Sequence, residues 1–272
     1  VPATVDLREW MRVLALERAF SNYDSYGFQR GKNMYAYMPS NRLWQLLIWD
    51  VDFSFGLGSA GQTTNALFGN ENDAVIARLK NYPPFQRLFW ASLKELVDGP
   101  FTVEKAEPQM LMRFDALVAN NAANQHPASV STWLRDRRTF ILSQLADVAS
   151  PLSVDLPAQV NTNANYLAVT GTAPVEADRI TVNGVGWAPE WLSLNQWRIY
   201  LPLAEGTNAL RIHAVDARGD PIGAAPMDRV VVTSASSEPA AGRVVINEIM
   251  YQSPAAGAAY VELHNTSGAT WY

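Results

Sequence analysis

Apolar side chains in the first half of the chain recur at the spacing of helices. Residues 7–20 carry five of them on one helical face: Leu7, Trp10, Met11, Leu14 and Ala15. Asp6, which comes directly before this segment, is a suitable N-cap. The same periodicity predicts further helices, which cover residues 73–80, 84–98, 103–120 and 129–148.

A different pattern interrupts these helices. Residues 34–38 and 43–49 are short apolar runs rich in aromatic and aliphatic side chains, and they predict two strands. Pro39, Ser40 and Asn41 between them are turn residues, so the two strands should form a hairpin. We therefore expect residues 1–150 to form one α+β domain that is mostly helical.

After residue 150 the chain changes to short β-rich runs separated by turn residues. These runs lie at residues 166–170, 179–182, 197–201, 209–215 and 229–233. Asn183-Gly184 between two of them is the strongest hairpin signal in the chain. Strands at this spacing predict an all-β sandwich over residues 151–234.

The end of the chain predicts a separate β segment. Residues 235–242 have the composition of a linker, and residues 243–251 and 259–265 predict two more strands. Because two strands alone are only marginally stable in water, we expect residues 243–272 to be the truncated beginning of a third domain. The predicted fold class is therefore multidomain.

Composition excludes several classes of protein. The formal net charge of −5 and the pI of about 5.3 argue against a nucleic-acid partner, because no basic excess is present to neutralise phosphates. No apolar run approaches the length of a transmembrane segment. The chain has no cysteine, which excludes disulfides, thiolate metal sites and a cysteine nucleophile.

Candidate chemistry is concentrated in acidic and amide residues around the predicted hairpin. Asp50 and Asp52 follow its second strand two positions apart, so we expect their carboxylates on one face. Two carboxylates ~6–7 Å apart repel by about 2–3 kcal/mol, which a cation between them would relieve. With Asp24 and Asn33 they form a hard oxygen set that suits Mg²⁺, Mn²⁺ or Ca²⁺ rather than zinc.

A simpler interpretation of the same residues stays open. An Asp-x-Asp pair at the end of a strand is often solvated or paired with arginine. Asn22 and Asp24 are also common turn or cap residues. What favours a site is the combination, since an acid, an amide and a pair of acids flank one hairpin.

Several of these residues together carry a family resemblance: Asn22-x-Asp24, Asn33-x-Tyr35-x-Tyr37, Trp44, and Trp49-Asp50-x-Asp52-x-Ser54-Phe55-Gly56. Over about residues 1–150 this pattern resembles the CotH (spore-coat H) kinase family, which are secreted, divergent relatives of protein kinases. The resemblance implies that this domain corresponds to the C-terminal, kinase-like lobe. It also implies transfer of a phosphoryl group from ATP to protein hydroxyls with a divalent metal such as Mg²⁺.

The resemblance also implies a role for each site residue. Asp24 corresponds to the catalytic base, Asn33 to the amide ligand of the metal, Asp50 to the principal metal carboxylate and Asp52 to an auxiliary ligand. Lys32 would contact phosphate or substrate. The interval of nine residues from Asp24 to Asn33 (33 − 24) is longer than the five of an ordinary kinase loop.

Other kinase parts are not found in the sequence. It contains no Gly-rich phosphate loop and no nucleotide-binding lysine with a glutamate partner, so we expect the chain alone not to transfer phosphate. Two functions therefore remain: part of a metal-dependent kinase, or a structural or adhesive protein that uses a kinase-like domain as a scaffold.

The later segments resemble extracellular modules. Residues 151–234 are similar to bacterial immunoglobulin-like modules, and residues 243–272 resemble the start of a lamin-tail domain. This combination implies a large secreted or cell-surface bacterial protein. Its expected partners are other extracellular proteins or further parts of the same polypeptide.

Overall fold

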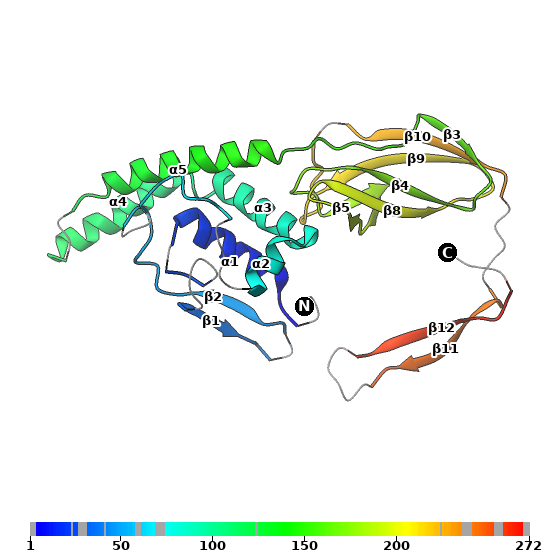
Figure 1. Cartoon of the computed structure of the whole chain (residues 1–272), viewed down its shortest axis with the longest axis horizontal. Coiled ribbons are helices and arrows are strands. Elements are labelled where there is room, and N and C mark those ends of the chain that lie inside the picture. The colour runs from blue at the N-terminus through cyan, green and yellow to red at the C-terminus, as the bar shows by residue number, and fades with distance from the viewer. Residues whose placement is uncertain are drawn as a thin grey trace. The chain divides into compact units, whose positions relative to one another are not determined.

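The first half of the chain is mostly helical with one β-hairpin, and the second half consists of strands (Figure 1). The structure is a computed structural model that describes residues 4–22, 24–26, 32–40, 42–57, 61–68, 74–122, 125–223, 225–235, 241–252 and 258–268. Its contacts divide the chain into two units. The first comprises residues 1–151, 172–178 and 191–196, and the second comprises residues 152–171, 179–190 and 197–272. The domain limits predicted from sequence stay a prediction.

The predicted helices are confirmed, each to within one residue at either end. They are α1 (Leu7–Phe20), α2 (Ala74–Lys80), α3 (Pro83–Asp98), α4 (Val103–Ala119) and α5 (Ala128–Asp147). The predicted cap of α1 is also confirmed, because the Asp6 side chain accepts a hydrogen bond from the Glu9 amide at 3.2 Å. The core of this unit is a continuous cluster in which α1, α3 and α5 bury their apolar faces.

The predicted hairpin is confirmed as β1 (Met34–Tyr37) and β2 (Gln45–Ile48), which pair antiparallel with Met34 opposite Ile48. Leu46 is buried, and its amide donates to the Glu9 carboxylate of α1 at 2.8 Å. Both strands are shorter than predicted. Because β2 ends at Ile48, Asp50 lies outside the strand.

The second unit contains two sheets. One has the strand order β3 (Gln159–Thr162), β10 (Met227–Thr233), β9 (Gly206–Val215), β5 (Arg179–Val182) and β6 (Val185–Trp187). The other has the order β4 (Tyr166–Thr172), β8 (Gln196–Pro202) and β7 (Glu190–Trp191). Both sheets contribute fully buried side chains, among them Val169, Ile180, Trp197, Ile212 and Val231. The predicted all-β sandwich is thereby confirmed.

The hairpin predicted from Asn183-Gly184 joins β5 to β6. Both turn residues have positive φ, 51° for Asn183 and 81° for Gly184, as a type I′ turn requires. The sequence did not predict β3, β6 and β7.

The last strands form a separate antiparallel pair, β11 (Val244–Met250) and β12 (Tyr260–Asn265), with β12 exposed along its whole length. The two predicted strands are confirmed, and the third domain stays a prediction. Among the helices in the described part of the chain, none is long and apolar enough to cross a membrane.

A buried arginine connects three segments of the first unit. Arg137 on α5 is 0% exposed, and its guanidinium donates hydrogen bonds of 2.5–3.2 Å to four backbone carbonyls: Arg18, Ala19, Thr63 and Asn65. Burial lowers the pKa of Arg137 to about 10. The group therefore stays charged at neutral pH, and it closes the C-terminal end of α1 against the segment that follows the hairpin.

We predict that Arg137→Met lowers the free energy of unfolding of the first unit by about 3 kcal/mol or more, because buried carbonyls lose a charged donor. Urea titration followed by far-UV circular dichroism at the helix band measures this change, since the second unit has no helix among its described residues. Arg135→Met, at an exposed position of the same helix, is the matched control. Equal midpoints for the two variants would contradict the prediction.

Candidate active site

The candidate site begins where α1 ends. Ser21 adopts the left-handed conformation with φ 55°, and the Ser21 amide donates to the Arg18 carbonyl at 3.1 Å. The Asn22 amide donates to the Glu17 carbonyl at 2.9 Å. These two bonds form a Schellman motif, which turns the chain sharply after the helix. The turn places Asn22 and Asp24 directly beside the helix end.

Asn22 connects this turn to the acidic segment after β2. Its side chain is 0% exposed, and its Nδ2 donates to Glu17 Oε2 at 2.7 Å and to the Asp50 carbonyl at 3.3 Å. The Ser25 hydroxyl in turn donates to the Asn22 carbonyl at 2.7 Å. Asn22 therefore contacts the segment of Asp50 through its side-chain amide and the loop of Asp24 through its backbone carbonyl.

Asp24, Lys32 and Asn33 contact one another. Asn33 Nδ2 donates to the backbone carbonyl of Asp24 at 3.1 Å and to its Oδ2 at 3.2 Å, and Lys32 forms an ion pair with the same Oδ2. Asn33 reaches this position with φ 55°. The Asp24 side chain is 11% exposed and that of Lys32 is 46% exposed, so the pair lies at the edge of the interior.

Asp50 and Asp52 approach each other through a turn. Asp50 has φ 56°, so the expectation that the two carboxylates share the face of a strand is wrong, because the strand has already ended. The side chains nevertheless interact: repulsion from Asp52 is the largest cause that raises the pKa of Asp50. Asp24 also raises this pKa and Lys32 lowers it. Asp52, Asp24 and Lys32 therefore all lie close enough to act on the Asp50 carboxylate.

A glycine fixes the turn that follows the acidic pair. The Phe55 amide donates to the Phe20 carbonyl at 3.0 Å, and Gly56 has φ 87°. A Cβ atom added at Gly56 would lie 2.7 Å from Cδ1 of Trp133 on α5. Phe55 packs against Phe20 and Trp133, with ring centroids 4.7 Å and 5.8 Å away. Only glycine fits this position without displacing the indole ring.

The donor set suits a hard divalent cation. Asp24, Asp50 and Asp52 supply carboxylates, and Asn33 retains its Oδ1 as an acceptor because its Nδ2 bonds to Asp24. Among the described residues, no three His, Cys, Asp or Glu side chains are gathered in the arrangement of a metal site. The roles assigned to Asp24, Lys32, Asn33, Asp50 and Asp52 stay a prediction.

The sequence did not indicate Glu17, which is 4% exposed beneath the site. Desolvation raises the pKa of Glu17 to about 7, although hydrogen bonds from Asn22 and Ser25 and the charge of Arg18 oppose this shift. The available signal was its position: Glu17 lies three residues after Leu14 on the apolar face of the helix.

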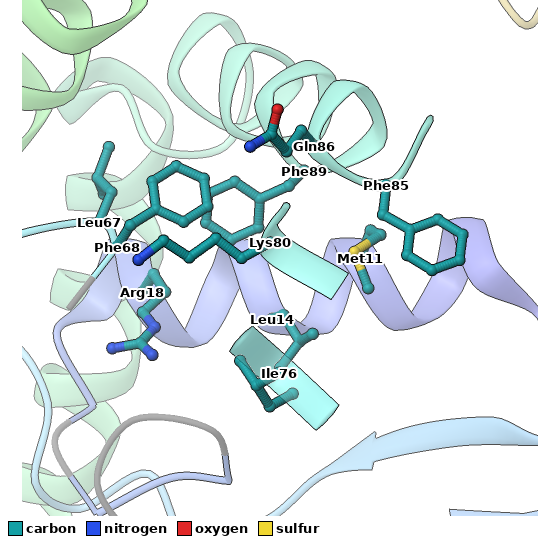
Figure 2. A pocket seen from close by; sticks show the side chains of 10 residues that line it. All are labelled: Met11, Leu14, Arg18, Leu67, Phe68, Ile76, Lys80, Phe85, Gln86 and Phe89. Atoms are coloured by element: carbon teal, nitrogen blue, oxygen red, sulfur yellow. The ribbon is translucent and has the colours of Figure 1, made fainter. Parts of the chain in front are cut away.

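An apolar hollow lies beside α1, and Figure 2 shows it from close by. It is a small cavity of about 30 Å³, and its lining is mainly apolar: Met11, Leu14, Arg18, Leu67, Phe68, Ile76, Lys80, Phe85, Gln86 and Phe89. The cationic groups of Arg18 and Lys80 lie toward its Leu67–Phe68 end. Its lining contains no carboxylate and none of the predicted site residues, so it is separate from the candidate active site.

Comparison with known families supports the assignment of the first domain. The family profile described as CotH kinase protein matches residues 1–141. The chain belongs to this CotH family.

Comparisons of the CotH chain with individual proteins and solved structures give only weak likenesses. No curated protein matches it. A structure of fibronectin(III)-like modules of Clostridium thermocellum CbhA matches with 16% identity and a TM-score of 0.25, covering 32% of this chain and 100% of that one. The GspB Siglec domain matches with 13% identity and a TM-score of 0.23, covering 36% of this chain and 65% of that one. At these scores neither likeness bears on function.

We predict that Gly56→Ala destabilises the CotH domain more than a positive φ alone explains. Gly184 is the matched control, because it has φ 81° but nothing within 4 Å of an added Cβ. Gly184→Ala should cost roughly 1–2 kcal/mol from backbone strain. Gly56→Ala should cost an additional 1–3 kcal/mol or so, because the new methyl group displaces Trp133. Urea titration of both variants measures the costs, and equal losses would contradict the packing argument.

A second prediction concerns the pH dependence of stability. The pKa of Glu17 is about 7 in the folded protein against 4.5 in the unfolded chain, so folding retains a proton that the unfolded chain releases. Stability contributed by the neutral form is present below pH 4.5 and is lost as pH rises toward 7, by about 3 kcal/mol in total. Glu17→Gln should remove this loss.

Urea unfolding of wild type and Glu17→Gln at pH 4, 6 and 8 tests this prediction. The advantage of the variant should grow with pH over that interval. Glu104→Gln, at an exposed position of α4, controls for the loss of one carboxylate. A difference between wild type and Glu17→Gln that is the same at all three pH values would contradict the argument.

Proposed function

We propose that residues 1–150 form the metal-binding part of a CotH-type kinase domain, which transfers a phosphoryl group from ATP to protein hydroxyls. One observation carries the proposal: Lys32 and Asn33 both contact the Asp24 carboxylate, and the charges of Asp24, Lys32 and Asp52 all act on the Asp50 carboxylate. A candidate base, a cationic side chain and a pair of candidate metal ligands, which come from two separate loops, thus occupy one region, as phosphoryl transfer requires.

Asp24 is the proposed base. Among the contacts that the structure describes, Lys32 and Asn33 both bond to Oδ2, which orients the carboxylate and leaves Oδ1 to accept a hydroxyl proton. Lys32 is the proposed contact to phosphate or substrate, and its partial exposure lets the ammonium exchange Asp24 for a phosphate oxygen.

Asp50, Asp52 and the Oδ1 atom of Asn33 are the proposed ligands of Mg²⁺, with Mn²⁺ or Ca²⁺ as alternatives. When bound, the ion would neutralise charge on the phosphates of ATP. The repulsion that raises the pKa of Asp50 supports this role, because a divalent cation between the two carboxylates relieves it. Metal affinity should consequently increase as pH rises and Asp50 ionises.

The later segments suit an extracellular setting. We propose that the β-sandwich is an immunoglobulin-like spacer and that β11 and β12 begin a lamin-tail domain of a secreted or surface protein. The sandwich topology and the membership of the first domain in the CotH family support this setting. The proposed partners are other surface proteins or further parts of the same polypeptide.

We predict that Asp24→Asn reduces autophosphorylation of the longest natural polypeptide that contains this chain by at least about a hundredfold, because the amide cannot accept the proton. Incorporation of labelled phosphate from ATP with Mg²⁺ measures the effect. Asp136→Asn, at an exposed position of α5, is the matched control. A wild-type polypeptide that transfers no phosphate would favour the structural or adhesive scaffold instead.

A further inference from the structure

Beneath the candidate site lies a buried polar pair that phosphoryl transfer does not itself use. Glu17 is 4% exposed and Asn22 is 0% exposed, and Asn22 Nδ2 donates to Glu17 Oε2 at 2.7 Å. Neither side chain is among the proposed metal ligands or the base. Burying a carboxylate and an amide costs free energy that an apolar pair would not. Stability alone therefore does not account for their presence.

The geometry of Asn22 shows what the pair can do. A side-chain amide carries two N–H donors, and Asn22 directs them to two acceptors from different parts of the chain. One is the carboxylate of Glu17 on α1, and the other is the Asp50 carbonyl at 3.3 Å. The Ser25 hydroxyl donates to the backbone carbonyl of Asn22 at 2.7 Å, so the loop of Asp24 is attached to the same residue.

The backbone conformation of Asp50 makes this contact important. Asp50 has φ 56°, in the left-handed region that non-glycine residues adopt infrequently, although aspartate is among those that tolerate it best. The hydrogen bond from Asn22 ends on the carbonyl of that same residue. Glu17 in turn orients the Asn22 amide, because Oε2 of Glu17 accepts a hydrogen bond from the NH₂ end of that amide.

We infer that Glu17 and Asn22 are positioning residues: through the Asp50 carbonyl they hold the carboxylates of Asp50 and Asp52 in register with the loop of Asp24. The inference rests on the proposed function, since the register matters for a shared metal site. Loss of an outer contact of this kind typically weakens metal affinity by about 10- to 100-fold.

The test uses the double variant Glu17→Leu/Asn22→Leu, which places apolar side chains of comparable length at both positions and removes the buried acid together with its partner. If the pair were only structural, this variant would behave as wild type once folded. We expect it to unfold at a similar temperature and to bind Mn²⁺ at least about tenfold more weakly in calorimetric titration. In the longer polypeptide kcat should fall by a similar factor.

Two further variants make the test specific. Glu17→Gln alone keeps an acceptor for Asn22 and should bind Mn²⁺ within about twofold of wild type. Glu17→Gln/Asn22→Asp reverses donor and acceptor, so the bond between the pair is kept while the donor to the Asp50 carbonyl is lost. This variant should fold and show the reduced kcat even if the double leucine variant does not fold. Asn120→Leu, at the exposed end of α4, is the matched control.

The outcomes separate the two proposals. A folded double leucine variant with wild-type Mn²⁺ affinity, or a reversed pair with wild-type kcat, overturns the positioning role and leaves the proposed function intact. A wild-type protein that binds no Mn²⁺ and transfers no phosphate overturns both. Weakened Mn²⁺ binding together with near wild-type binding by Glu17→Gln supports the inference.

Discussion

The candidate site depends on how the last turn of α1 satisfies its carbonyl groups. A helix leaves its final four carbonyls without partners in the helix. Here the Glu17 carbonyl accepts from Asn22, those of Arg18 and Ala19 from the buried Arg137, and that of Phe20 from Phe55. The guanidinium also places a positive charge at the negative end of the helix dipole. Both loops of the site are thus attached to one helix end, and Arg137 closes that end from α5.

The region around the C-terminal end of α1 carries an excess of negative charge. Three aspartates are present in the site, and Lys32 is the cation that contacts Asp24 and lowers the pKa of Asp50. The unbalanced negative charge favours a divalent cation with oxygen ligands, and it agrees with the membership of the chain in the CotH family. The apolar hollow beside α1 has a lining without carboxylates, so it does not offer this chemistry.

Much of the fold was readable from the sequence, because the helices have strong apolar periodicity and the hairpins have characteristic turn residues. The strands β3, β6 and β7 were missed since they span only two to four residues, which is too short for an alternating pattern to stand out. The candidate site residues were predicted from their motif and stay a prediction, whereas the strand geometry expected for Asp50 and Asp52 was wrong, since a positive φ is not visible in a pattern. Glu17 and Arg137 were missed because charged residues in a helical pattern are normally assigned to the solvent face.

The central claim is that Asn33, Asp50 and Asp52 bind one divalent ion beside Asp24. The most direct measurement is a crystal structure of the chain grown with Mn²⁺, with anomalous scattering recorded at the manganese edge. The account predicts a single strong anomalous peak at coordination distance from Asp50, Asp52 and the Oδ1 atom of Asn33. An ordered site with all three side chains visible and no peak beside them, at saturating Mn²⁺, would contradict it.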